Sequence, residues 1–169
     1  MKKKLKIVGS GSHCKVIIDC ALSNGYKIEY IIDINSTKKT NEKIFGIPVN
    51  NKNTIKKIKK NDSVFLAIGD NKIRSYYFKI LKLKLVKFIN LISKNSFVSH
   101  YAILGDGILI NNNCIINADS KINDNCIINS GAIIEHDVKI GKNSHICPGV
   151  IIGGNTLIGQ NCFIGLGSN

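Results

Sequence analysis

The chain has 169 residues and a formal net charge of +13; 44% of its residues are hydrophobic and 21% are charged. This length allows one ordinary domain or two small ones, and the composition excludes a wholly disordered chain and a coiled coil. No apolar run approaches the roughly 20 residues that cross a bilayer, and the apolar stretch behind the basic start is too short for an export signal. We therefore expect a cytoplasmic protein that does not bind membranes.

The positive charge is confined to the first part of the chain. Residues 1–100 carry a net charge of +15, whereas residues 101–169 carry −2. This contrast predicts two domains, over residues 1–95 and 96–169. The lysines are not interleaved with aromatic residues and Arg74 is the only arginine, so a nucleic-acid partner is not expected. A compositional bias toward lysine, asparagine and isoleucine would explain the charge, as would attraction of a phosphate-bearing substrate.

The six cysteines and four histidines do not have the spacing of a metal site. No C-x-x-C pair occurs, and no two histidines are separated by four residues, a spacing found in some zinc sites. We therefore predict no metal and expect the cysteines to be free thiols in a reducing compartment.

The first part of the chain alternates apolar segments with amphipathic ones. Strands are predicted at residues 5–8, 28–33, 63–68 and 86–92, and helices after residue 13, around 54–60 and over 72–85. Strands that alternate with helices are typical of an α/β domain with a parallel sheet.

A glycine turn follows the first predicted strand, in Gly9-Ser10-Gly11-Ser12-His13. Glycines before a helix N-terminus favour anion binding, but Cys14 stands where the dinucleotide fingerprint needs its third glycine. Asp33 lies about 20 residues further on, where nucleotide-binding folds place an acid for the ribose. A simple turn at the end of a strand would explain Asp33 equally well.

The second part of the chain is a six-residue repeat. Every sixth residue is aliphatic over eleven successive positions: Leu104, Ile110, Ile116, Ile122, Ile128, Ile134, Ile140, Ile146, Ile152, Ile158 and Ile164. Neither a helix, with its period near 3.6, nor a flat strand, with its period of two, explains this spacing. A short strand followed by a corner does, in a solenoid whose aliphatic residues stack from coil to coil.

Two further positions of the repeat are restricted. Four places after each aliphatic residue the side chain is nearly always small, and Cys114, Cys126 and Cys162 fall there as predicted core residues. The place directly after the aliphatic residue is usually glycine or asparagine, for example Gly105 and Asn111. Because these residue types tolerate a positive φ, we expect the tight corners at this place.

The pattern resembles the hexapeptide repeat of left-handed β-helix acyltransferases, in which three hexads form one coil of 18 residues. Residues 104–169 would then make about three and two-thirds coils. With this spacing, Ile115, Ile133 and Ile151 should stack as an outward apolar ridge. Such a ridge would contact either a neighbouring subunit or the N-terminal domain.

His136 is the candidate general base. It stands between Glu135 and Asp137 at an outward place in its hexad, and a carboxylate beside an imidazole raises its basicity and orients its ring. His145 lies nine residues later, half a coil away, so the two histidines should be on the order of 15 Å apart on different sides of one subunit. His100 has no motif and is assigned to the linker between the domains.

From Lys6 to Asn169 the chain resembles the sialic acid O-acetyltransferase and UDP-4-amino-sugar N-acetyltransferase family. The resemblance is carried by the glycine turn with His13, by residues 67–71 and 129–137, and by the hexads. It implies a Rossmann-like N-terminal α/β domain followed by an all-β left-handed parallel β-helix. It also implies acetyl-CoA as co-substrate, held between adjacent β-helices of a homotrimer. Ser12 and Cys14 depart from the family's glycines, and Asp137 replaces its frequent glutamate.

The resemblance also assigns roles to individual residues. His136 would be the catalytic base, with Asp137 as the acid that increases its basicity. His145 and Leu166 would bind acetyl-CoA. The sugar acceptor, a nucleotide-linked amino sugar or sialic acid, would be bound by Gly11, Ser12, His13, Asp33, Ile34 and Gly69.

Two functions of different classes follow from these observations. The first is an acetyl-CoA-dependent acetyltransferase that acts on an amino group or a hydroxyl of a sugar by direct transfer. The alternative is a non-catalytic trimeric scaffold that binds a nucleotide sugar. The hexads continue to Asn169 without a capping segment, so we also expect the chain to be truncated at its C-terminus.

Overall fold

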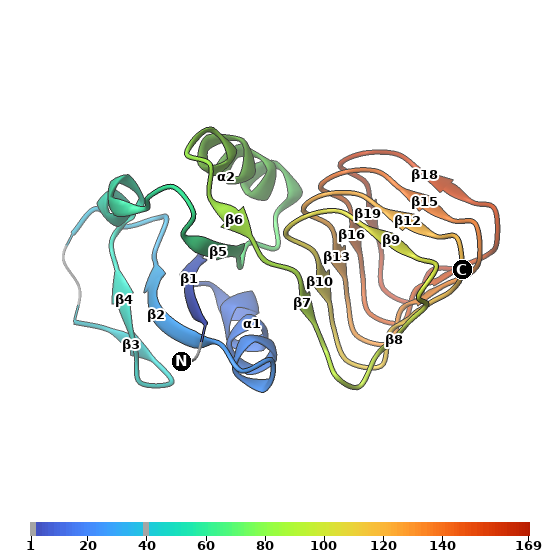
Figure 1. Cartoon of the computed structure of the whole chain (residues 1–169), viewed down its shortest axis with the longest axis horizontal. Helices are drawn as coiled ribbons and strands as arrows, with labels where there is room; N and C mark the ends of the chain where they lie inside the picture. The colour runs from blue at the N-terminus through green and yellow to red at the C-terminus, as the bar shows by residue number, and fades with distance from the viewer. Residues whose placement is uncertain (1–2, 39–40) are drawn as a thin grey trace. The chain divides into compact units, whose positions relative to one another are not determined.

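The computed structural model describes residues 3–38 and 41–169 and contains two compact units (Figure 1). The first unit ends at Ile89 and the second begins at Asn90. The sequence predicted one strand over residues 86–92. The structure divides this segment into β6 (Lys87–Phe88), which belongs to the first unit, and β7 (Leu91–Ile92), which belongs to the second. In the described part of the chain, no helix has the length and apolar character needed to span a membrane.

The first unit is built on a six-stranded sheet in the order β3-β4-β2-β1-β5-β6. Its other strands are β1 (Lys4–Val8), β2 (Lys27–Ile32), β3 (Lys43–Ile44), β4 (Ile47–Asn50) and β5 (Ser63–Leu66). The predicted parallel sheet is confirmed for five strands, but β3 pairs antiparallel with β4 and makes the sheet mixed. Phe45 and Gly46, both with positive φ, form the two-residue turn of this hairpin.

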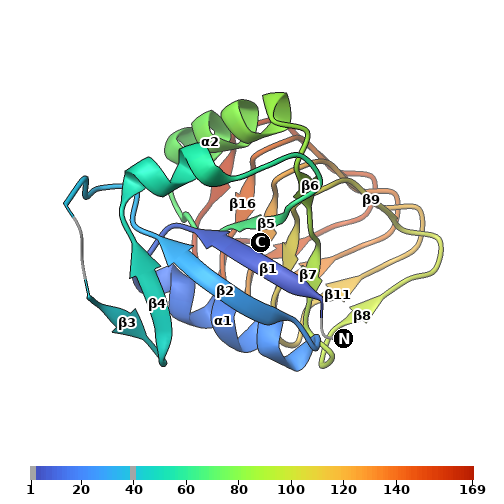
Figure 2. The same cartoon turned by 60° about the vertical axis from the view of Figure 1, so that its left-hand side comes forward.

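Two α-helices cover opposite faces of this sheet (Figure 2). Helix α1 (Ser12–Ser23) buries Cys14, Ile17 and Ile18. Helix α2 (Asn71–Leu83) packs Tyr77, Phe78 and Leu81 into a core on the other face. Asp70 begins α2, because its carboxylate accepts a hydrogen bond of 2.8 Å from the Ile73 amide. The predicted basic helix around residues 54–60 is a 3-10 helix, η1 (Lys52–Lys57).

The second unit is a left-handed parallel β-helix of three sheets. Their orders are β19-β16-β13-β10-β7, β17-β14-β11-β8 and β18-β15-β12-β9. Paired residues are 18 apart, as Ile115, Ile133 and Ile151 are, so three hexads make one coil. The remaining strands are β8 (Phe97–Val98), β9 (Ile103–Leu104), β10 (Leu109–Ile110), β11 (Ile115–Ile116), β12 (Lys121–Ile122), β13 (Ile127–Ile128), β14 (Ile133–Ile134), β15 (Lys139–Ile140), β16 (His145–Ile146), β17 (Ile151–Ile152), β18 (Leu157–Ile158) and β19 (Phe163–Ile164).

The aliphatic and small positions of the repeat form the core of the β-helix, as predicted. Cys114 and Cys126 are buried in it, whereas Cys162 is only half-buried, and all six cysteines are free. Small polar residues also join the coils: the Ser120 hydroxyl donates to the Glu135 carbonyl at 2.7 Å. The repeat begins two hexads earlier than Leu104, because Ile92 and Val98 already pack against this core.

The prediction for the corners is wrong in its position. Positive φ occurs three places after each aliphatic residue and not at the next place, for example at Asn113, Asp119 and Asp137. Where coils stack closely, the glycine directly after the aliphatic residue has a different explanation. A Cβ on Gly141 would lie 2.5 Å from the Gln160 nitrogen of the following coil. Glycine at that place therefore permits coil stacking, whereas aspartate, asparagine or glycine at the later place permits the turn.

Candidate active site

His136 and Asp137 form a hydrogen-bonded pair at the corner between β14 and β15. The His136 Nδ1 atom lies 2.8 Å from Asp137 Oδ2, and the two side chains are 59% and 51% exposed. Asp137 has a φ of 62°, a conformation that aspartate tolerates better than most residues. A carboxylate on Nδ1 orients the imidazole and leaves Nε2 to accept a proton, which is the arrangement of a general base.

Backbone hydrogen bonds fix this corner to the coils on both sides. The Asp137 amide donates to the Ala118 carbonyl at 3.0 Å, and the Asn155 amide donates to the His136 carbonyl at 3.0 Å. These residues are one coil apart in each direction. The backbone of the pair is therefore part of the solenoid ladder, while both side chains remain accessible to solvent.

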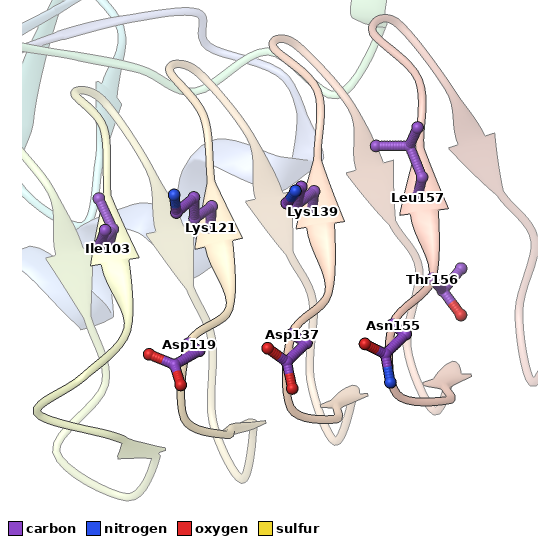
Figure 3. Close-up of a pocket in the computed structure, with 8 residues that line it drawn as sticks. All are labelled: Ile103, Asp119, Lys121, Asp137, Lys139, Asn155, Thr156 and Leu157. Atoms are coloured by element: carbon purple, nitrogen blue, oxygen red, sulfur yellow. The ribbon is translucent and has the colours of Figure 1, made fainter.

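A surface groove of about 480 Å³ runs beside this corner along the β9-β12-β15-β18 sheet (Figure 3). Asp119, Asp137 and Asn155 stand in a column along one edge, one from each coil, and point the same way (Figure 3). Lys121 and Lys139 lie on the strands beside them. The groove therefore offers carboxylates and ammonium groups to a ligand next to His136. Its lining is Ile103, Asp119, Lys121, Asp137, Lys139, Asn155, Thr156 and Leu157.

His145 lies on another sheet of the β-helix, at the start of β16. It is buried; its Nε2 atom is 3.2 Å from Asn129 Nδ2, and its ring is edge-on to Phe163 at 5.2 Å. Leu166 follows β19 and is 76% exposed. The two histidines therefore lie on different sides of the coil, and the corner with His136 and Asp137 does not include His145 or Leu166.

The predicted apolar ridge is present on the β8-β11-β14-β17 sheet. Ile115, Ile133 and Ile151 pair in register, and Phe97 extends the row by one coil. Phe97, Ile115 and Ile151 are exposed in the single chain. His100, assigned from the sequence to a linker, lies in the β-helix between β8 and β9, two coils before His136.

The predicted acceptor-binding residues lie at the carboxyl ends of three neighbouring parallel strands. Gly11, Ser12 and His13 follow β1, Asp33 and Ile34 follow β2, and Gly69 follows β5. Strand β2, which follows β1 in the chain, pairs with one side of β1, and β5 pairs with the other side. The carboxyl end of β1 is therefore a topological switch point of the sheet. Open α/β sheets bind ligands at such a point.

Asp33 also has the local role of a turn residue, because its Oδ1 atom accepts a hydrogen bond of 2.9 Å from the Asn35 amide. Gly11 is the residue before α1, and a Cβ there would meet nothing within 4 Å. The backbone at Gly11 is therefore open to a ligand at the start of the helix.

Arg74 binds the segment that follows β5 at this edge of the sheet. It is buried in helix α2, and its Nη1 atom donates to the carbonyls of Ile68 and Gly69 at 3.0 Å each. Its Nη2 atom donates to Asn71 Oδ1 at 2.8 Å. The guanidinium therefore holds the β5–α2 loop in which Gly69 lies.

Burial, together with the positive charge of Arg74, lowers the pKa of His13 from 6.5 to about 4. The unfolded chain then binds more protons than the folded chain between these values, so the stabilisation is complete above pH 6.5 and is lost as the pH falls toward 4. We expect His13 to contribute up to about 3 kcal/mol to this loss. Urea unfolding at a series of pH values checks it, because His13→Gln should flatten the dependence; an unchanged slope would contradict the prediction.

Sequence reasoning missed several residues of these sites. Asp119 lies one coil before Asp137, and Lys121 lies one coil before Lys139, so the period of 18 residues that aligns the isoleucine ridge also brings these polar residues to the groove. Asn129, whose Nδ2 atom lies beside His145 Nε2, belongs to the segment 129–137 that carried the family resemblance, but no role of its own was assigned to it from the sequence. The burial of Arg74 has no signal in the sequence beyond its being the only arginine.

Comparison with known proteins assigns both units. The PglD N-terminal domain matches residues 4–81, and the bacterial transferase hexapeptide (six repeats) matches residues 119–154. No curated protein matches the chain in sequence.

Solved structures of sugar acetyltransferases are similar over nearly the whole chain. The acetyltransferase domain of PglB from Neisseria gonorrhoeae is 28% identical, with a TM-score of 0.87 over 98% of this chain and 80% of that one. A His-to-Asn variant of perosamine N-acetyltransferase from Caulobacter crescentus, in complex with CoA and GDP-perosamine, is 26% identical, with a TM-score of 0.74 over 98% and 90%. PerB from the same organism, with the same ligands, is 25% identical, with a TM-score of 0.73 over 98% and 90%.

The small α/β domain, the left-handed β-helix and these matches define a hexapeptide-repeat acyltransferase. Within that class, the PglD N-terminal domain match and the similarity to the PglB domain and to perosamine N-acetyltransferase fit the UDP-4-amino-sugar N-acetyltransferase family.

Proposed function

We propose that the protein transfers the acetyl group of acetyl-CoA to the amino group of a nucleotide-linked sugar, with His136 as the general base. The observation that carries the proposal is the His136–Asp137 pair beside the groove. The similar perosamine N-acetyltransferase, whose structure holds CoA and GDP-perosamine, supports an amino sugar as acceptor. Transfer to a hydroxyl, including that of a sialic acid, uses the same base and is the alternative outcome of the test.

In the proposed reaction, His136 Nε2 takes a proton from the acceptor amine as its nitrogen attacks the thioester carbonyl. Asp137 stabilises the imidazolium that forms. As the carbon–sulfur bond breaks, the imidazolium returns the proton to the departing thiolate, so the products are the acetamido sugar and CoA. Among the described residues, the His136 ring is bonded to a carboxylate and not to a serine or cysteine, which favours direct transfer over an acyl-enzyme.

The residues present fit both substrates in their chemistry. Lys121 and Lys139 in the groove suit the phosphates of acetyl-CoA, and Leu157 offers an apolar surface to its pantetheine chain. In the proposed assembly, His145 and Leu166 of a neighbouring subunit complete this site. The nucleotide of the acceptor would contact Gly11, Ser12, His13, Asp33, Ile34 and Gly69, where the glycine turn and the start of α1 offer backbone N–H groups to an anion.

Free thiol release tests the proposed function. The full chain is mixed with acetyl-CoA and, in turn, with GDP-perosamine, a UDP-4-amino sugar, the matched 4-hydroxy nucleotide sugars and a sialic acid. We expect thiol release only with a nucleotide-linked amino sugar. Release with the hydroxy sugars or the sialic acid would overturn the choice of the amino group. Acceptor binding without release from any of them would favour the scaffold function.

The apolar ridge supports assembly as a homotrimer. Exposed isoleucines in register on one sheet are an unfavourable surface for a monomer in water. We expect sedimentation to give a trimer, and Ile133→Asp, at the centre of the ridge, to give monomers with unchanged circular dichroism. A monomeric wild-type protein, or an Ile133→Asp variant that stays trimeric, would contradict this assembly.

We also propose that the protein acts in the cytoplasm. All six cysteines are free, and burial raises the pKa of Cys14 to about 12 and that of Cys20 to about 11. Burial therefore makes Cys14 and Cys20 unreactive, and six free thiols fit a reducing compartment.

A further inference from the structure

Gly154 lies directly against the imidazole of His136. A Cβ built on Gly154 would be 2.8 Å from both Cε1 and Nε2 of His136 and 3.3 Å from Nδ1. These distances are shorter than carbon and nitrogen atoms allow without movement. The part of the ring that holds Cε1 and Nε2, the atom assigned to proton transfer, therefore occupies the space that a side chain at position 154 would fill.

The two residues are held at this distance by the solenoid. They are 18 residues apart, and the Asn155 amide donates to the His136 carbonyl at 3.0 Å, so the backbone of one coil is bonded to that of the next. Gly154 cannot retreat without breaking this ladder. The imidazole, in contrast, is the exposed end of a flexible side chain. Any added Cβ would therefore displace the ring and leave the backbone in place.

No feature of the backbone itself requires glycine at position 154. Gly131 and Gly149 have a φ of +70°, which explains glycine there, but Gly154 does not lie in the left-handed region. Gly141 is required by close coil stacking, because its Cβ would meet backbone atoms. At Gly154 the three nearest atoms all belong to the His136 ring. The imidazole is the feature of the structure that a side chain at this position would disturb.

We propose that Gly154 is a positioning residue for His136: the missing side chain lets the imidazole lie on the next coil while Nδ1 keeps its bond to Asp137. This inference rests on the proposed function, because it assumes that His136 is the base. The inference adds a sequence requirement to the site, because position 154 must be glycine wherever the base has this orientation.

The test compares Gly154→Ala with Gly153→Ala. The two glycines are adjacent and exposed, neither has a positive φ, and a Cβ on Gly153 meets nothing within 4 Å. Gly153→Ala therefore controls for the general cost of alanine in this turn. We expect Gly154→Ala to lower kcat by about 10–100-fold, since a misplacement of about 1 Å can cost 10²-fold. KM values and thermal stability should stay near those of the wild type, and Gly153→Ala should be unchanged in every respect.

Two readouts separate a displaced base from a merely weakened fold. The NMR resonance of the His136 Cε1 proton, assigned by its absence in His136→Ala, should move in Gly154→Ala and not in Gly153→Ala. The thermal midpoint of Gly154→Ala should meanwhile stay at the wild-type value, which a weakened fold would lower. The other ionisable groups at this corner, Glu135 and Asp119, are the same in both variants, and Glu135 accepts a hydrogen bond from Asn117 at 2.9 Å.

The outcomes distinguish this inference from the proposed function. If His136→Ala is inactive but Gly154→Ala has wild-type kcat, the role of Gly154 is refuted and the function stands. If Gly154→Ala loses activity while the His136 resonance is unmoved, the positioning role is also refuted. If His136→Ala retains activity, the proposed function itself has failed.

Discussion

Replacement of His136 by alanine is expected to lower the rate of acetyl transfer by about 10²–10⁴, because the acceptor then attacks without a positioned base. The His136 side chain is 59% exposed and lies outside the β-helix core, so the thermal midpoint should not change. Acetyl-CoA binding should also be retained, since the base acts on the acceptor. Steady-state thiol release and isothermal titration with acetyl-CoA measure the two effects.

His100 provides the matched control for this variant. It is an exposed histidine at the corner two coils earlier, and His100→Ala should retain full activity. Asp137→Asn should cost less than His136→Ala, because the imidazole stays in place but a neutral amide no longer stabilises the imidazolium that forms in the reaction. A His136→Ala variant with more than about a tenth of the wild-type rate would contradict the general-base role.

Gly9→Ala is expected to destabilise the first unit by about 3 kcal/mol or more, because two effects combine at this position. Gly9 has a φ of +112°, and an added Cβ would lie 2.6 Å from the Ala67 carbonyl oxygen in the segment after β5. Its amide also donates to the Ile32 carbonyl at 2.9 Å, so the backbone is fixed between two neighbouring strands. Urea unfolding followed by the helical circular dichroism signal measures the loss, since α1 and α2 both lie in this unit.

Gly11→Ser is the control in the same turn. Gly11 has a φ of −69° and open space around its Cβ direction, and serine favours the position before a helix. Its free energy of unfolding should therefore stay within about 1 kcal/mol of the wild type. Equal losses in Gly9→Ala and Gly11→Ser would show that the close approach to Ala67 does not limit this turn.

The β-helix could be predicted from the sequence because its period repeats in one dimension. Each buried aliphatic residue has its equivalent six places on, and the coil of 18 then places Ile115, Ile133 and Ile151 in one row. Ile92 and Val98, with Ser96 and Ala102 four places after them, obey the same rule, so the earlier start of the solenoid was present in the sequence. The corner position was misassigned because asparagine and glycine fit both a positive φ and a close contact between coils.

The candidate active site was predictable only in part. His136 and Asp137 are adjacent in sequence, so their pairing needed no knowledge of the fold. Gly154 and Asp119 lie one coil away, and their importance depends on the direction of the imidazole and of the corner residues, which composition does not encode. The altered pKa of His13 likewise arises from burial beside Arg74, a residue 61 positions away in the chain.

Mass spectrometry of a single reaction mixture tests the central claim most directly. The full chain is incubated with acetyl-CoA and a nucleotide-linked amino sugar, and the masses of the sugar and of the intact protein are followed together. Direct transfer with His136 as base predicts a sugar heavier by one acetyl group, a protein of unchanged mass, and almost no product from His136→Ala. An unmodified sugar, or an acetylated protein that passes its acetyl group to the sugar, would contradict it.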